Sequence, residues 1–350
     1  MERGAAKGIC KRERKGNLEE MQRTNVEPTA WSRWLNQYKN RESALCWPTY
    51  KLFLVTTLGL GLAPPSTSVR ALHRFAVKGL ERDELPSVLL SVNEGFPSDR
   101  RWALHFDDAK PFHATQPEWL HKSNFLCAFT ATELLAGFVT TFDDDTATLR
   151  VWRRSAQQPG ATGDELGDAL LAARLDEEQG RAAASTFFSN CCGRGCSVVT
   201  AGAHQFGNTG SGLKASGDVR TVHLVNENTV AALSEACGVA LHPDRFRPNL
   251  IVGGALPAWE EFSWVGREVR LGEVTLRVIS RTVRCEGVNV DARHGSFKAY
   301  LDIPGLLATH FPEHGPYLGV YAQVVEGGRV RLGDAVESGG EGKEIVVKIW

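Results

Sequence analysis

One cysteine of this chain stands in a setting that favours chemistry. Cys285 ends an alternating segment, 274–285, directly after Arg284 and four residues after Arg281. A guanidinium group nearby favours the thiolate form of a cysteine, which is the form that attacks electrophiles and binds metals. Two interpretations are open: a reactive or metal-binding thiolate, or an inert cysteine buried on a strand, a common position for free thiols.

Four basic residues are candidates for binding an anion: Lys78, Arg100, Arg245 and Arg247. The planar guanidinium group pairs bidentately with phosphate oxygens, and lysine adds a point charge. An ordinary salt bridge is the alternative, particularly for Arg245, which follows Asp244 directly.

Polar residues near turns are further candidates. Asn226, Thr229 and Asn249 have side chains that can hydrogen-bond a bound ligand, but helix capping by Asn226 and turn formation by Asn249 explain them equally well. His204 lies in a Gly-rich segment, where it either faces a substrate or makes a hydrogen bond within the loop. Asp291, six residues after Cys285, is either an orienting carboxylate or a plain turn residue.

The other cysteines carry little information about chemistry. Eight cysteines scattered over 350 residues do not resemble a disulfide framework, so we expect reduced thiols and a cytoplasmic protein. Cys191, Cys192 and Cys196 form the one close group, with His204 as a conceivable fourth zinc ligand. Structural zinc sites take two spaced pairs of ligands, so incidental thiols in a Gly-rich segment are the preferred interpretation.

Short alternating segments that would position these residues begin at Val69. Turn signals recur about every ten residues, a pattern typical of β-barrels and sandwiches, so we expect a mainly β fold with two packed β-barrel-like units and a few short helices. Strict alternation places Cys285 on the face opposite Val274, unless a bulge near Ser280 resets the phase. Helices are expected over residues 164–184 and, between an Asn cap and Gly238, over residues 229–237. The remaining expected strands cover residues 69–77, 85–92, 101–106, 146–152, 197–200, 219–225, 250–252, 268–271, 274–285, 319–325 and 329–332.

Charge and hydropathy exclude two classes of protein. Residues 1–66 hold 11 Lys/Arg and 6 Glu, which leaves the rest of the chain with more acidic than basic groups. Such a body is unsuited to general nucleic-acid binding, which depends on neutralising phosphates. No apolar segment reaches the length of a transmembrane segment, because the best one, residues 52–63, ends at Pro64. We therefore expect no nucleic acid and no membrane span.

An ordered set of motifs resembles a known family. The set comprises Lys78-Gly79, Asp99-Arg100-Arg101, Lys122-Ser-Asn, Ala203-His204-Gln-Phe206, Val225-Asn226-Glu-Asn-Thr229, Arg245-Phe-Arg247-Pro-Asn249, Arg281-Thr-Val-Arg284-Cys285, Asn289-Val-Asp291, Tyr317-Leu-Gly-Val-Tyr321 and Val330-Arg-Leu-Gly-Asp334. In this order they resemble MOSC (molybdenum cofactor sulfurase C-terminal) domain proteins with an N-terminal MOSC β-barrel, similar to the amidoxime-reducing component family. The resemblance implies a poorly ordered basic extension over 1–66, the N-terminal barrel over 67–160, the MOSC domain over 164–338 and a tail over 339–350.

The resemblance also implies a chemistry. Cys285 would bind the metal of a molybdenum-pterin cofactor, since a high-valent metal with sulfur ligands accepts a soft thiolate. The protein would then be an oxidoreductase that reduces a small N-hydroxylated substrate with electrons from a separate redox protein. The alternatives are a cofactor or sulfur carrier that uses Cys285 without turnover, and a plain interaction barrel. Pyridoxal phosphate, which accompanies the family label, is not expected, because residues 1–66 are too short for its domain.

Overall fold

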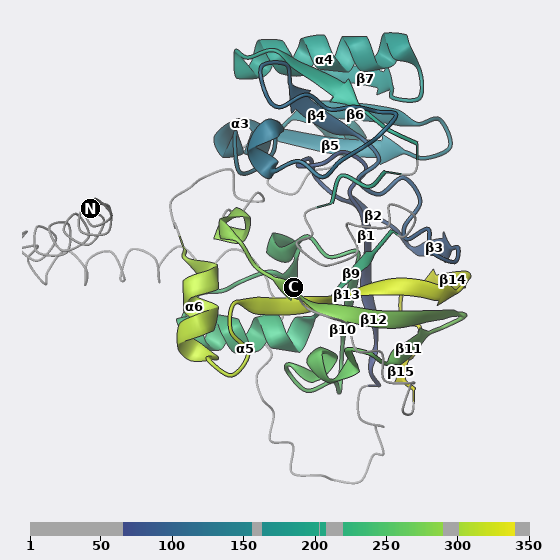
Figure 1. Ribbon diagram of the computed structural model, residues 1–350, viewed down its shortest axis with the longest axis vertical. Helices are drawn as coiled ribbons and strands as arrows, with labels where there is room; N and C mark the ends of the chain where they lie inside the picture. The colour runs from purple at the N-terminus through teal and green to yellow at the C-terminus, as the bar shows by residue number, and fades with distance from the viewer. Residues whose placement is uncertain (1–65, 156–162, 203, 208–219, 290–300, 340–350) are drawn as a thin grey trace, which may run out of the picture. The chain divides into compact units, whose positions relative to one another are not determined.

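The computed structural model describes residues 66–155, 163–202, 204–207, 220–289 and 301–339 (Figure 1). Strands dominate this part of the chain and its helices are short, which confirms the expected mainly β fold. The strands are β1 (Ser68–Arg74), β2 (Asp83–Glu84), β3 (Ser87–Leu90), β4 (Ala103–Phe106), β5 (Phe138–Asp143), β6 (Thr148–Arg153), β7 (Leu171–Arg174), β8 (Cys196–Val199), β9 (Val222–Asn226), β10 (Leu250–Gly253), β11 (Glu268–Leu271), β12 (Val274–Val283), β13 (Tyr317–Glu326), β14 (Gly328–Arg331) and β15 (Val336–Ser338). The helices are α3 (Thr132–Ala136), α4 (Glu178–Cys192), α5 (Glu227–Cys237) and α6 (Ile303–His310), with 3₁₀ turns η2 (Lys122–Asn124), η3 (Gly163–Leu166), η5 (Pro243–Phe246), η6 (Glu260–Trp264) and η7 (Glu286–Asn289).

The largest sheet has eight strands in the order β15-β11-β12-β13-β9-β10-β1-β2. Strands β9 and β10 are parallel and the other neighbours are antiparallel. The sheet curls until β1 reaches the residues before β15, where Ser68 bridges Ala335. Such closure satisfies the backbone groups that an open sheet edge would leave exposed.

Alternating apolar residues build the core inside this sheet. Val274, Leu276 and Val278 of β12 are almost fully buried, together with Val320 and Val324 of β13. A strand points successive side chains to opposite faces, so this period-two pattern gives one apolar face. The register of β12 against β13 shifts between Val278 and Ser280, which is the exception to strict alternation that the sequence left open.

A second group of strands has its own core. Strands β5, β6 and β7 form one antiparallel sheet, and β4 pairs with β8. Helix α4 packs against β7 and β8, as Figure 1 shows, and buries Ala184 and Phe188 among apolar residues of these strands. Position in the chain does not decide which group a strand belongs to. Strands β1 and β3 come before β4 in the chain, yet β1 pairs with β10 and β3 pairs with β14.

Helix α5 begins and ends where its capping residues predict. The Asn226 side chain accepts a hydrogen bond from the Asn228 backbone N–H, and Gly238 ends the helix in the left-handed conformation at φ 64°. These are the preferred N-cap and C-cap geometries. The side chain of Asn226 is therefore engaged in the fold.

Two sequence-based expectations were wrong in their details. The helix expected over residues 164–184 is a 3₁₀ turn, then β7, then α4 from Glu178 to Cys192, because pairing with β6 overrides the helical composition of residues 171–174. The strand expected to reach Cys285 ends at Val283, and Cys285 lies just before η7. Helix α6 was not anticipated at all.

Most of the residues expected to form the extension 1–66 and the tail 339–350 lie outside the described residues, as does Asp291. In the part that the structure describes, none of the helices combines the length and apolar character needed to traverse a bilayer.

Candidate functional site

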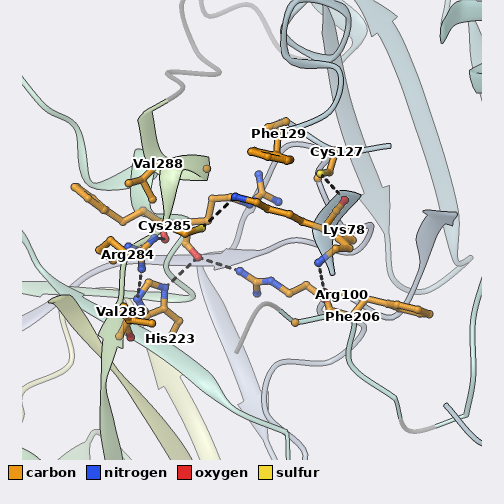
Figure 2. Close-up of a pocket in the computed structure, with 18 of the residues that line it drawn as sticks. Lys78, Arg100, Cys127, Phe129, Phe206, His223, Val283, Arg284, Cys285 and Val288 are labelled. Carbon is orange, nitrogen blue, oxygen red and sulfur yellow. Dashed lines mark hydrogen bonds between the residues drawn. The ribbon is translucent and has the colours of Figure 1, made fainter. Parts of the chain in front are cut away.

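A cavity of about 280 Å³ opens among the segments that follow β1, β4 and β12 and the segment that precedes β10 (Figure 2). Six of the 25 described residues that line it are Lys or Arg, and none of them is Asp or Glu. The six are Lys78, Arg100, Lys122, Arg245, Arg247 and Arg284. Cations gathered around an open space without facing carboxylates favour an anionic ligand.

Lys78 lies on a buried part of the cavity wall. Its backbone N–H donates to the Trp102 carbonyl at 2.8 Å, and its ammonium group donates to the Phe206 carbonyl at 3.2 Å. Burial lowers the pKa of this ammonium to about 8, and the nearby guanidinium groups lower it as well. The neighbouring Gly79 has φ +90°, and a Cβ there would come within 2.6 Å of Cys127 Cα, so this close approach requires glycine.

Arg100 and Arg247 share one aromatic platform. Their guanidinium carbons lie 4.7 and 4.2 Å from the ring centroid of Phe75, and Arg100 Nη2 donates to the Arg247 carbonyl at 3.0 Å. Both residues adopt left-handed backbone conformations, at φ 50° and 53°. Such strained positions persist only where the surrounding contacts hold them.

A single buried carboxylate balances part of this charge. Asp99 pairs with Arg100 and also accepts from Phe75 N–H at 2.9 Å and from Asn249 Nδ2 at 3.0 Å. Arg247 is partly exposed and lines the cavity. Its guanidinium group donates to the Leu80 carbonyl at 2.8 Å. Burial lowers the pKa of Arg247 to about 9, with Arg100 adding to the effect. An anion entering the cavity would relieve this excess of positive charge.

The thiol of Cys285 is exposed at the end of the cavity opposite Lys78, as Figure 2 shows. The ammonium group of Lys122 lies 3.7 Å from its sulfur. Of the two interpretations of Cys285, an exposed thiol beside an ammonium group fits a reactive or metal-binding cysteine and does not fit an inert cysteine buried on a strand. The geometry therefore leaves the sulfur accessible to a metal or an electrophile.

Two arginines hold the segment that carries Cys285. Arg284 donates to the Phe246 carbonyl at 3.0 Å and lies 3.3 Å from His223 Nε2. Arg245 donates to the carbonyls of Val288 and Asn289 at 3.1 and 3.0 Å. Burial lowers the pKa of His223 well below its ordinary value, and Arg284 acts in the same direction, so this imidazole is neutral. Arg245 thus supports the η7 turn after the thiol.

The structure brings together most, but not all, of the residues selected from the sequence. Cys285, Lys78, Arg100, Arg245, Arg247 and Asn249 line the cavity. The amide of Asn249 is already used, since it bonds Asp99 and the backbone of residues 73 and 223.

Asn226, Thr229 and His204 do not line the cavity. The amide of Asn226 donates to Glu261 Oε2 at 3.1 Å, and the Thr229 hydroxyl donates to the same oxygen at 2.9 Å, in a sealed interior cluster. His204 packs its ring against Phe206, with centroids 4.7 Å apart.

Sequence reasoning missed Lys122 and His223 as members of the site. Lys122 is part of a motif that the sequence shares with the resembled family, but nothing local indicates that it meets a cysteine 163 residues away. His223 is the one titratable residue of β9, and its place between Val222 and Leu224 is the signal that could have marked it.

The cysteine group at the end of α4 does not form a metal site in the described residues. Cys196 is buried and receives a hydrogen bond from the Ser189 hydroxyl, while Cys191 and Cys192 pack beside the core around α4. Among the residues with described positions, no three His, Cys, Asp or Glu side chains converge in a way that could hold a metal ion.

Comparisons with known proteins give one family match and several distant structural likenesses. The family model described as "MOSC domain" matches residues 211–337. YiiM from Geobacillus stearothermophilus is similar at 16% identity and TM-score 0.27, over 35% of this chain and 55% of YiiM. YiiM from Escherichia coli is similar at 18% identity and TM-score 0.26, over 36% of this chain and 57% of YiiM. The YUAD protein from Bacillus subtilis is similar at 12% identity and TM-score 0.34, over 79% of this chain and 97% of YUAD. The chain thus spans about half the length of the YiiM proteins. No curated protein matches the chain.

Proposed function

Because this chain contains a MOSC domain, a domain associated with molybdenum cofactor binding, we propose that it is a molybdenum-cofactor-dependent oxidoreductase that removes oxygen from a small N-hydroxylated compound. The reaction adds two electrons and two protons to an N–OH group and releases an amine or amide and water. The electrons come from a separate redox protein.

The observation that carries this proposal is the combination of an exposed thiol and unbalanced positive charge in one cavity. Cys285 lines the same 280 Å³ space as six Lys and Arg side chains. A pterin cofactor with a terminal phosphate and a metal needs both features: cations for the phosphate and a soft ligand for molybdenum.

The residues present fit such a cofactor. Lys78, Arg100 and Arg247 are grouped by their shared neighbours, since Arg100 and Arg247 lie on Phe75 and both lower the pKa of Lys78. They would bind the phosphate, and Cys285 would bind the metal. When bound, the cofactor would supply two-electron transfer at a metal with an open position.

The protein's own groups prepare the site for this ligand. Arg284 and Arg245 fix the backbone on both sides of the thiol, which limits the freedom of the sulfur. Neutral His223, between the Arg247 carbonyl and Arg284, orients that guanidinium group without adding another charge. Lys78 is charged at pH values below its pKa of about 8, so it adds a positive charge for the phosphate at physiological pH.

The test is the metal and pterin content of the protein produced in a host that makes the cofactor. Mass spectrometry should find near-stoichiometric molybdenum in the wild type and less than a tenth of it in Cys285→Ala. Cys127→Ala is the matched control, because it removes the other cysteine that lines the cavity. Equal molybdenum in wild type and Cys285→Ala would refute the ligand assignment, and a wild type without molybdenum or pterin would refute the proposal.

The exposure of Cys285 also favours a second function, a sulfur or cofactor carrier. An exposed thiol next to an ammonium group can bear a persulfide as well as a metal. A carrier would hold sulfane sulfur or cofactor and would not reduce N-hydroxylated compounds with any electron donor. Cyanolysis of the purified protein, which releases sulfane sulfur as thiocyanate, detects a sulfur carrier. Reduction of an N-hydroxylated compound with an external electron donor separates the oxidoreductase from either kind of carrier.

A further inference from the structure

The mouth of the cavity carries an unusual concentration of exposed apolar side chains. Among the described residues, eight large apolar side chains are exposed, and three of them line this one cavity: Trp119, Phe129 and Val283, at 40%, 39% and 52% exposure. Exposed apolar groups gathered at a cavity mark a binding surface more often than scattered ones do.

Two of these residues belong to an ordered aromatic row. The ring of His121 lies between Trp119 and Phe129, with centroids 6.2 and 6.4 Å away and interplanar angles of 76° and 85°. Both angles are edge-to-face arrangements, which aromatic rings prefer. We name Trp119, His121, Phe129 and Val283 the aromatic rim.

Three of the four rim residues lie on one anchored segment, residues 119–129, and Val283 ends β12. The His121 side chain accepts a hydrogen bond from the Ser123 backbone N–H, which begins the η2 turn. Directly after this turn, Phe125 and Leu126 are buried at 2% and 0% exposure. A subsite on anchored backbone loses little entropy when it binds a ligand.

Lys122 joins the rim to the reactive end of the cavity. Its ammonium group lies 3.6 Å from the ring centroid of Phe129 and 3.7 Å from the sulfur of Cys285. A ligand that presents its reactive group to Cys285 would therefore extend the rest of its body along the rim.

We propose that the aromatic rim selects the substrate: an N-hydroxylated compound with a flat aromatic body and no positive charge. This inference rests on the proposed function and specifies the substrate class of the same site. Aromatic rings on the rim favour a planar apolar body, since stacked and edge-to-face ring pairs add to the free energy of burial. Lys122 and the other five lining cations repel a positively charged compound.

Equilibrium binding to metal-free protein tests the rim separately from catalysis. The probes are benzohydroxamic acid and acetohydroxamic acid, which share the N-hydroxylated group and differ by the ring. Calorimetry on the wild type should give at least tenfold tighter binding of the aryl compound. Phenylguanidinium, which puts a ring on a cation, should bind at least tenfold more weakly than benzohydroxamic acid.

Substitutions at Phe129 connect the preference to the rim. Phe129→Leu should reduce the aryl preference to less than threefold, and Phe129→Trp should retain it, although both keep an apolar side chain. Leu89→Ala removes an exposed apolar side chain that does not line the cavity and should leave the preference unchanged. Lys122→Met should strengthen the binding of phenylguanidinium.

The outcomes separate this inference from the proposed function. An aryl preference that is absent in the wild type, or that survives in Phe129→Leu, overturns the selection by the rim. Another outcome is a preference lost in Phe129→Leu in the binding test, together with a wild type from a cofactor-making host that holds no molybdenum. That pair of results supports the rim as a ligand subsite and overturns the substrate assignment together with the proposed reaction.

Discussion

Two buried polar clusters of this protein balance their charges in opposite ways. Lys78, Arg100 and Arg247 face a cavity. Asp99 pairs with Arg100, and Glu81, which also acts on Arg247, pairs with Arg154, so the cluster keeps an excess of positive charge. Glu261, in contrast, is fully buried and receives hydrogen bonds from two neutral side chains, those of residues 226 and 229. Burial of polar groups is common to both clusters, and only access to a cavity makes the first one a candidate binding site.

The pKa values of the two clusters express the same contrast. Burial raises the pKa of Glu261 to about 7, which favours a neutral carboxyl group inside the fold. Burial lowers the pKa of Lys78 to about 8, which a bound anion would reverse. Protonation therefore lowers the cost of burying Glu261, whereas binding of an anion would lower the cost of burying Lys78 in its charged form.

The largest effect that we predict is on stability, from Glu261→Gln. Since the folded pKa is raised from 4.5 to about 7, the folded state binds more protons in this window, and the free energy of unfolding falls as pH rises through it. The loss approaches about 3 kcal/mol, from 1.4 kcal/mol per pH unit. Denaturant unfolding of the wild type at pH 5 and pH 8 should show most of this loss of unfolding free energy. The Glu261→Gln variant should show no such loss.

Glu260→Gln is the control for this substitution, because the neighbouring Glu260 is more exposed. It should follow the wild-type dependence on pH. Parallel stability profiles for the wild type and Glu261→Gln would contradict the assignment of a neutral buried carboxyl group.

The next effect is on anion binding, from Arg247→Met. Loss of one charge-assisted contact in the cavity should weaken the binding of sulfate by about 2 kcal/mol, or ~30-fold. Titration calorimetry at pH 7 measures it. Arg267→Met is the matched control, since Arg267 is exposed and does not line the cavity, and equal sulfate affinities in both variants would remove Arg247 from the site.

The pH dependence of sulfate binding gives a smaller effect. Lys78 is charged below its pKa of about 8, so sulfate affinity should be constant from pH 6 to 7 and fall by up to tenfold per unit above pH 8. Sulfate keeps its own charge over this range. Lys78→Met should bind sulfate weakly and remove most of the dependence on pH, because the guanidinium groups that line the cavity stay charged over this range. A wild-type affinity that rises with pH would reverse the sign and exclude Lys78.

The smallest effect is predicted for Asn226→Ala. This change removes the cap of α5 and one hydrogen bond to Glu261, and should lower the free energy of unfolding by about 1 kcal/mol. Sulfate affinity should stay within twofold of the wild type. A larger loss of sulfate binding would show that the two clusters are coupled.

Local pattern predicted most strands because alternation needs only neighbouring residues. The apolar face of Val274, Leu276 and Val278 follows from the sequence in this way, whereas the register shift near Ser280 was only an open alternative. Pattern failed over residues 171–174, where alanine-rich composition indicates a helix and pairing with β6 makes a strand. A strand partner elsewhere in the chain cannot be deduced from composition.

The sequence by itself determined the mainly β class, the presence of α5 and its end before Gly238, and a set of cationic and thiol candidates. Only the tertiary structure decided which of them meet: it placed Arg247 beside Arg100, 147 residues away, and Lys122 beside Cys285, and it assigned Asn226 and Thr229 to a sealed cluster. The physical reason is that accessibility and charge balance depend on every group that surrounds a side chain after folding, whereas sequence spacing constrains only its neighbours along the chain.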